Sequence, residues 1–243
     1  AGLLGSWVCR DAMQAGKQVL SADKLSAEEL EKVKPFRFEA GQEPEFISLD
    51  ITDAESVKSL FASRDIDAVV HTAAITFIPA AIENPQLAFD VNTTGTFNLL
   101  LAARDKAVKR FAYVSTSSTY GDFQFTPADE SHPLQPKDIY GATKASADML
   151  VQSMCKTYEL PTNCIRTSSL YGPGELEKRV VKNFVENALT GKPLQLQGGG
   201  QLRRDFSYVR DVARGMVQVL DSEEAAGELF NITGGTDHAI RDV

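Results

Sequence analysis

The sequence has few of the residues that build disulfide frameworks and metal centres. Three cysteines occur among 243 residues, at Cys9, Cys155 and Cys164, and no two of them form a CxxC pair. Sparse, odd-numbered cysteines fit a reducing compartment and offer no metal-ligand spacing. We therefore expect a cytoplasmic protein that holds no metal ion.

The sequence also lacks an excess of positive charge and any long apolar run. Lysine and arginine number 25 against 33 aspartate and glutamate residues, which leaves a net charge of −8. This balance disfavours nucleic acid as the main partner. No apolar run approaches the ~20 residues of a membrane span, and the first residues lack the basic segment of a signal peptide. Neither membrane insertion nor a signal peptide is predicted.

What the sequence does contain is an alternation of apolar β-rich runs with helical patterns. The hydrophobic content of 43% is ordinary for a globular protein, and 243 residues allow one large domain with a smaller appendage. The alternation predicts strands at 18–23, 45–51, 67–74, 110–117 and 163–172, and helices at 53–63, 85–107 and 138–157. Such an order is typical of an α/β protein with a doubly wound parallel sheet.

The pattern changes after Gly172. A helix at about 177–190, a short strand at 205–209 and a helix at 210–221 do not simply continue the alternation. We expect residues 1–172 to form the sheet domain, and 173–243 part of a small C-terminal lobe that binds substrate.

The first residues, AGLLGS, place Gly2 and Gly5 at the start of a helix. Two glycines there let backbone N–H groups approach a pyrophosphate, which the helix dipole also attracts; a simple tight turn is the alternative. In a dinucleotide-binding fold such glycines follow a first strand. We expect that strand to be missing from this sequence, and both ends of the chain to be truncated.

Acidic and small residues at the strand ends extend this cofactor pattern. Asp23 ends a strand about 20 residues after the glycines, where a carboxylate accepts bonds from the adenosine ribose and repels a 2′-phosphate. NAD is therefore favoured over NADP, although Asp23 also suits a plain turn. Asp50 closes the next strand and is expected near the adenine, while Ala73 and Ala74 allow close approach of a ligand. Asn92 lies inside a predicted helix, either orienting backbone near the cofactor or as a buried hydrogen-bonded residue.

A hydroxyl, a phenol and an amine form the predicted catalytic set. Thr116 ends a strand, and Tyr140 and Lys144 are four residues apart, so they share one helix face. A tyrosine pKa near ~10 is too high for a base at neutral pH, but a nearby ammonium and a nicotinamide cation favour the phenolate. Tyr140 would then take a proton from a substrate hydroxyl held by Thr116 while hydride moves to NAD⁺. The alternatives are an ordinary surface pair and a strand end rich in serine and threonine.

In their order and spacing, AGLLGS, HTAA, VSTSSTYG, YGATK, LYGPG, RRDFSYVRDVA and NITGG resemble the NAD-dependent epimerase/dehydratase family of extended short-chain dehydrogenases/reductases. The resemblance implies a Rossmann-type domain interleaved with a substrate lobe, NAD held throughout turnover, and usually a nucleotide-sugar substrate. It also implies a homodimer paired through 85–107 and 138–157. By position it matches Thr116, Tyr140 and Lys144 to catalytic residues, Asp23, Asp50 and Ile51 to cofactor contacts, and Arg204 to an arginine that meets substrate phosphates.

The sequence departs from the family pattern at three substrate-facing positions. Family 4,6-dehydratases place Asp-Glu directly after the catalytic threonine, where this chain has Ser117 and Ser118. The acid/base pair that eliminates water is thus absent, as is the glutamate of the decarboxylases. Many members have asparagine shortly before the YGP turn, where Ser169 offers a shorter hydrogen-bonding side chain.

The leading hypothesis is an NAD-dependent nucleotide-sugar epimerase, inverting C4 of a UDP-hexose through a transient 4-keto sugar. A family reductase acting on a keto-sugar or another carbonyl is one alternative, against which Asp23 weighs because reductases more often use NADPH. A non-catalytic NAD-binding regulator is another. The presence of Thr116, Tyr140 and Lys144 weighs against it.

Overall fold

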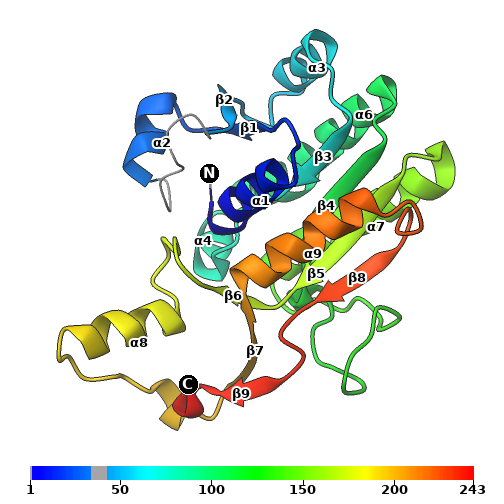
Figure 1. Cartoon of the computed structure of the whole chain (residues 1–243). Coiled ribbons are helices and arrows are strands. Elements are labelled where there is room, and N and C mark those ends of the chain that lie inside the picture. Colours follow the sequence, from blue (N-terminus) through cyan, green and yellow to red (C-terminus); the bar gives the residue numbers. More distant parts are fainter. Residues whose placement is uncertain (1, 34–42) are drawn as a thin grey trace.

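The fold begins with a helix and a separate pair of strands. The structure is a computed structural model that describes residues 2–33 and 43–243 (Figure 1). Helix α1 spans Leu3–Gln14 with Gly2 as its N-cap. Strand β1 (Leu20–Asp23) pairs in parallel with β2 (Glu45–Ser48), and α2 (Ala27–Val33) precedes β2 in the chain. Both strands were predicted, at 18–23 and 45–51, whereas α2 was not.

The central sheet has four parallel strands in the order β3-β4-β5-β8. Its strands are β3 (Ala68–His71), β4 (Arg110–Thr116), β5 (Thr162–Thr167) and β8 (Leu229–Ile232). Nearly every residue of β4 and β5 is buried, as expected of strands covered on both faces. The predicted α/β class with a parallel sheet is confirmed. Within the described residues, β1 and β2 share no hydrogen-bonded ladder with this sheet.

Helices cover both faces of the central sheet. On one face, α1 and α9 (Val209–Asp221) pack against Ala112 and Ile165. Apolar residues of α9 recur at the 3, 4 and 7 spacing that gives a helix one apolar stripe; they are Val209, Val212, Ala213 and Met216. The other face carries α3 (Ala54–Ser63), α6 (Thr96–Lys106) and α7 (Ile139–Tyr158), whose apolar residues join one cluster.

The helix predicted at 85–107 is interrupted by a wider turn. Helix α5 (Pro85–Phe89) leads into a π-helical segment, η1 (Asp90–Gly95), and then into α6. The preceding α4 (Ile78–Glu83) was not predicted. Asn92 lies in the π-helical segment, and such turns often occur at functional sites.

The strand predicted at 163–172 divides between two sheets. After β5 the chain turns at Ser168, whose hydroxyl donates to the Asp205 carbonyl at 2.7 Å. Strand β6 (Ser169–Tyr171) then pairs with β7 (Arg203–Tyr208), which also pairs antiparallel with β9 (Asp237–Ala239). Figure 1 shows these strands and α8 (Val180–Leu189) set apart from the central sheet.

The division into 1–172 and 173–243 stays a prediction. Strand β8 and helix α9 follow residue 173 in the chain yet pack on the central sheet, which is the interleaving that the family resemblance implies. Short 3₁₀ turns complete the chain at Ser117–Thr119, Gln197–Gly200 and Ile240–Asp242. No helix in the described ranges is long and apolar enough to span a membrane.

Candidate functional site

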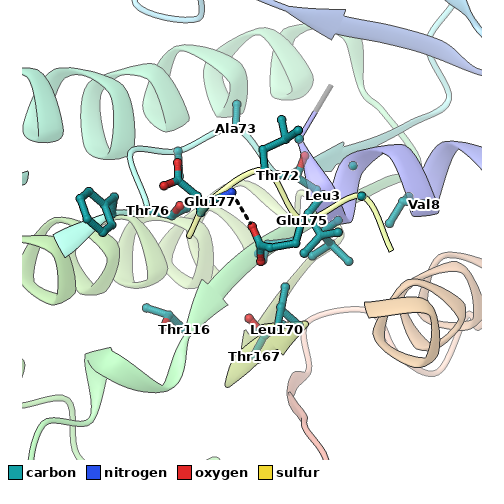
Figure 2. Close-up of a pocket in the computed structure, with 18 of the residues that line it drawn as sticks. Leu3, Val8, Thr72, Ala73, Thr76, Thr116, Thr167, Leu170, Glu175 and Glu177 are labelled. Carbon is teal, nitrogen blue, oxygen red and sulfur yellow. Dashed lines mark hydrogen bonds between the residues drawn. The ribbon is translucent and has the colours of Figure 1, made fainter. Parts of the chain in front are cut away.

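A cleft of about 2470 Å³ runs along the whole of β3 and past the carboxyl ends of the neighbouring strands. Residues at the ends of β1, β3, β4 and β5 line it, as do the loop after β6 and α8. Figure 2 labels lining residues of α1, of the loop after β3, of β4, β5 and β6, and of the loop after β6. Ligands of parallel sheets bind at such strand ends. Of the predicted site residues, all but Asn92 line this cleft: Gly2, Gly5, Asp23, Asp50, Ile51, Ala73, Ala74, Thr116, Ser117, Tyr140, Lys144, Ser169 and Arg204.

The N-terminus of α1 opens into the cleft. A Cβ placed on Gly2 would meet no described atom within 4 Å, whereas one on Gly5 would lie 2.9 Å from the Thr72 hydroxyl oxygen. Gly5 is therefore needed for α1 to pack closely on the loop after β3, and Gly2 leaves space at the helix end. The first turn contains no acidic side chain, so the partial positive charge of this end is available to an anion.

The two predicted carboxylates at strand ends also shape their own turns. The Leu25 amide donates to Asp23 at 3.2 Å, and the Thr52 amide and hydroxyl donate to Asp50 at 2.9 and 2.7 Å. Asp23 therefore serves its turn, as its alternative states, and it also lines the cleft, as does Asp50. Their contacts with the cofactor stay a prediction.

Asn92 does not line the cleft, and its contacts agree with both of its alternatives, a residue that orients backbone and a buried hydrogen-bonded residue. It is fully buried, and its side chain donates to the Ile75 carbonyl at 3.1 Å and the Thr143 hydroxyl at 3.0 Å. It also accepts from the Ile75 amide at 2.8 Å. Asn92 thus joins the loop after β3, which carries Ala73 and Ala74, to α7.

Tyr140 and Lys144 lie in the first turns of α7, and both side chains are buried. The Asp138 side chain caps this helix by accepting from the Gly141 amide at 2.7 Å. Thr116 ends β4 and accepts from the Ser118 amide at 3.2 Å. The structure therefore brings the three predicted catalytic side chains to one wall of the cleft.

Burial dominates the electrostatics of this wall, and the role predicted for Lys144 stays a prediction. The Lys144 ammonium donates to the Val114 carbonyl at 2.6 Å and lies 4.1 Å from the centre of the Tyr113 ring. Burial lowers the pKa of Lys144 to about 7. Burial also raises the pKa of Tyr140, and a hydrogen bond with Thr116 and the charge of Arg179 oppose that rise. In this structure the lysine is directed at the backbone of β4 rather than at the phenol.

The predicted substrate-side residues lie on three different elements. Ser117 begins the 3₁₀ turn after β4, and Ser169 begins β6 opposite Phe206. Arg204 is an exposed residue of β7 whose strand partner is His238. The fold brings them to one cleft from positions as far apart as 117 and 204.

The sequence reasoning missed the charged loop between β6 and α8. Glu175, Glu177 and Arg179 line the cleft from this loop, and Figure 2 shows the bond from the Glu177 amide to the Glu175 carboxylate, 3.0 Å long. Arg179 donates to the Thr76 hydroxyl at 3.2 Å and lies 3.7 Å from Glu175. The signal that could have found them is the charged run ELEKR directly after the Gly-Pro-Gly turn that ends a strand.

Comparison with known proteins gives relatives of two activities. A dTDP-glucose 4,6-dehydratase of Neisseria meningitidis is 35% identical over an aligned length of 258. The alignment covers all of this chain and 71% of the relative. A UDP-glucuronate 4-epimerase of Thermodesulfobacterium geofontis is 34% identical, over 97% of this chain and 73% of the relative.

Among solved structures, the Thermus thermophilus UDP-glucose 4-epimerase in complex with NAD is similar at a TM-score of 0.88 and 30% identity. The similarity covers all of this chain and 78% of that one. The model of the NAD dependent epimerase/dehydratase family matches residues 1–233. As its sequence motifs predicted, the chain belongs to the NAD dependent epimerase/dehydratase family.

Proposed function

We propose that this chain is a nucleotide-sugar epimerase that uses NAD, the cofactor of its family, and inverts C4 of a UDP-hexose. The observation that carries the proposal is the meeting of Thr116, Tyr140 and Lys144 on one wall of the cleft. Relatives that act on nucleotide sugars support the substrate class.

The cleft residues fit NAD. The open N-terminus of α1 at Gly2 suits a pyrophosphate, because backbone N–H groups and the helix dipole favour an anion there. Asp23, at the end of β1, suits the ribose hydroxyls and disfavours a 2′-phosphate. When bound, NAD supplies an acceptor for a hydride from the sugar, and the same hydride returns at the end of the cycle.

In the proposed reaction, Tyr140 takes the proton of the C4 hydroxyl as the hydride leaves C4. A 4-keto sugar results, and it turns before the hydride returns to its other face. Tyr140 then gives the proton back to the C4 oxygen, so the enzyme ends as it began. Thr116 holds that oxygen by a hydrogen bond.

An epimerase is favoured over a dehydratase by the residues that follow Thr116. Elimination of water needs a carboxyl group that can give and take a proton near neutral pH. Ser117 and Ser118 bear hydroxyl groups, which form hydrogen bonds but do not ionise near neutral pH and so do not serve as the acid/base pair.

A dehydratase is the second candidate, because Glu175 and Glu177 bring carboxyl groups to the same cleft. Dehydratases are also among the relatives of equal similarity. If this chain catalysed the dehydratase reaction, these glutamates would take the place of the missing acid/base pair.

Proton NMR of sugar nucleotides with the protein and NAD⁺ tests the proposal. UDP-hexoses and dTDP-glucose are supplied separately, and the anomeric signals are followed. A C4 epimer without accumulation of NADH is the expected result. A 4-keto-6-deoxy sugar would indicate the dehydratase instead. If neither product forms, a separate reaction that contains NADH and a keto-sugar tests the reductase, which would oxidise the NADH as it reduces the ketone.

The Tyr140→Phe variant separates catalysis from a purely regulatory role. It keeps the aromatic ring in its apolar surroundings and removes the hydroxyl that moves the proton. We expect turnover to fall at least about 100-fold while NAD binding is retained. Full turnover in this variant would sink the enzymatic reading.

We also propose a homodimer that pairs α5, α6 and α7 with those of a second copy. These helices expose large apolar side chains: Leu87, Phe89, Phe97, Ile139 and Met149. Such exposure is typical of an interface. A monomer in sedimentation experiments at micromolar concentration would refute the pairing.

A further inference from the structure

Trp7 lies in α1 behind the wall of the cleft, and it is the single tryptophan of the sequence. It is 5% exposed, and its neighbours Leu4, Gly5 and Val8 line the cleft. The indole Nε1–H donates to the Pro173 carbonyl at 3.0 Å, across 166 residues of chain. This bond joins the helix whose N-terminus suits a pyrophosphate to the Gly-Pro-Gly turn after β6.

The orientation of the indole is fixed by its surroundings. Its ring packs in the apolar cluster that α1 and α9 form on the central sheet. The guanidinium carbon of Arg10 lies 5.1 Å from the ring centre, and that of Arg210 lies 5.7 Å from it. Both distances are within the range of cation–π attraction. A ring held in this way keeps the direction of its N–H, so Trp7 offers the turn a donor at a fixed place.

The turn that accepts this bond is tightly seated. Gly172 has a φ of +145°, and a Cβ on it would lie 2.6 Å from the Val209 side chain and 3.1 Å from the Tyr208 ring. The Glu175 amide donates to the Gly172 carbonyl at 3.3 Å. Because the position requires glycine and the Pro173 carbonyl is bound, the chain leaves the turn in one direction.

The loop that follows the turn brings charged groups to the cleft. Glu175, Glu177 and Arg179 line the cleft from this loop. Arg179 also donates to the Thr76 hydroxyl at 3.2 Å. Trp7 thus holds the end of the loop next to β6, and Arg179 holds the end next to α8.

We infer that Trp7 is a positioning residue for the sugar nucleotide, because its bond to the Pro173 carbonyl sets the place of this charged loop. The inference rests on the proposed function, which makes a sugar nucleotide the substrate. The proposed contacts of NAD lie at α1 and at the strand ends, which leaves the loop to the sugar nucleotide. A loop held in one place binds ground state and transition state alike, so its release should raise KM and leave kcat unchanged.

The single tryptophan allows a test that changes one group of atoms. A tryptophan auxotroph supplied with the benzothiophene analogue of tryptophan, in which sulfur replaces the indole N–H, yields a protein altered at residue 7 alone. The analogue keeps the shape of the ring and its packing in α1, but it cannot donate to the carbonyl. The same protein made with 5-fluorotryptophan, which keeps the N–H, is the matched control.

Titration calorimetry and initial rates compare the two proteins with UDP-hexoses in the presence of NAD⁺. With the sulfur analogue we expect the Kd and the KM of the sugar nucleotide to rise about three- to tenfold, the size expected for one neutral hydrogen bond. The kcat and the Kd of NAD should change less than about twofold. Trp7→Phe also lacks the donor and should raise the same two constants.

Equal affinity of the two labelled proteins for the sugar nucleotide would overturn the inference. An equal loss of affinity for NAD would also overturn it, since the whole cleft would then be disturbed. Because calorimetry needs no turnover, a sugar nucleotide that binds in this pattern but is not epimerised would reject the proposed reaction and keep the role of Trp7. If the control binds no sugar nucleotide, the proposed function and the inference are both rejected.

Discussion

Lys144 combines complete burial with a single backbone hydrogen bond, and burial lowers its pKa from 10.5 to about 7. Between these two values the unfolded chain holds a proton on this amine and the folded chain does not. The unfolded state therefore binds more protons, and stability rises with pH across this window. Lys144 costs the fold stability below the window, where the buried amine must be charged.

We expect Lys144→Met to lose this dependence. The free energy of unfolding is measured with urea at about pH 7.5 and about pH 9.5. In the unchanged protein it should be higher at the higher pH, and in the variant the difference between the two pH values should be smaller. Lys58→Met, at an exposed position of α3, is the matched control. Equal slopes in the protein and in Lys144→Met would contradict the assignment.

Asp148 and Arg166 form an ion pair in the interior, with side chains 0% and 2% exposed. Two guanidinium nitrogens donate to the carboxylate, at 3.0 and 3.1 Å. Burial alone would raise the pKa of Asp148, but Arg166 and two neutral donors outweigh it and hold that pKa below its ordinary value. The pair stays ionised at neutral pH.

Asp148→Ala should destabilise the protein by about 3–5 kcal/mol, because it leaves a buried guanidinium without its anion. Urea unfolding monitored by circular dichroism measures the loss. The double change Asp148→Leu with Arg166→Met removes both charges and is expected to recover part of it. A loss below about 1 kcal/mol for the single variant would show that water or another group replaces the carboxylate.

At the scale of elements, the π-helical segment between α5 and α6 places Asn92 against two other elements. Its amide bonds hold Ile75, at the end of the loop after β3, and Thr143 of α7. One side chain thus fixes the loop that carries Ala73 and Ala74 relative to the helix that carries Tyr140.

Asn92→Ala should cost about 1–3 kcal/mol of stability, since it removes the hydrogen-bond partner of the partly buried Ile75 backbone groups and of the buried Thr143 hydroxyl. We also expect weaker NAD binding by titration calorimetry, because the loop loses its support. Thr94→Ala, an exposed position in the same segment, is the control and should change neither quantity. Unchanged NAD affinity in Asn92→Ala would limit the residue to folding.

The elements that the sequence predicted well are those with strong local patterns. Helix α7 has a capping aspartate and a long apolar face, and β4 is a continuous buried run. The break at Ser168 was missed because both halves of the run suit a strand. Their separation depends on pairing with β4 and β8 on one side and β7 on the other, which no local pattern contains.

In the candidate site, too, residues placed by local patterns could be predicted and residues placed by long-range contacts could not. Residues at strand ends, such as Asp23 and Thr116, could be predicted because parallel strands bring their carboxyl ends to one edge. Arg179 could not, because its position comes from a contact with Thr76 that is 103 residues away. The direction of the Lys144 ammonium was likewise set by the packing of α7 on β4, which the spacing of Tyr140 and Lys144 does not encode.

At the scale of the whole molecule, the described residues form sheets with separate hydrogen-bonded ladders. The β1-β2 pair and the four-stranded central sheet both contribute strand ends to one cleft. A ligand that reaches from Asp23 to Thr116 contacts both sheets at once. NAD at about 100 times its Kd would add about 2.7 kcal/mol to the stability of the folded state.

Scanning calorimetry should detect whether bound NAD makes the β1-β2 pair and the central sheet unfold together. Without NAD we expect the β1-β2 region to open at a lower temperature than the central sheet, which broadens the transition. With NAD we expect one sharper transition at a higher temperature. A shift of the whole curve with no change in its width would show that the two sheets already unfold together.

The breadth of the cleft carries a consequence for the protein in a living cell. Its lining reaches from Gly2 to Ile240, so a dinucleotide bound there would contact the folded chain alone and would lower the fraction of molecules that is open to proteases. The lifetime of the protein, and hence its abundance, would then follow the supply of dinucleotide.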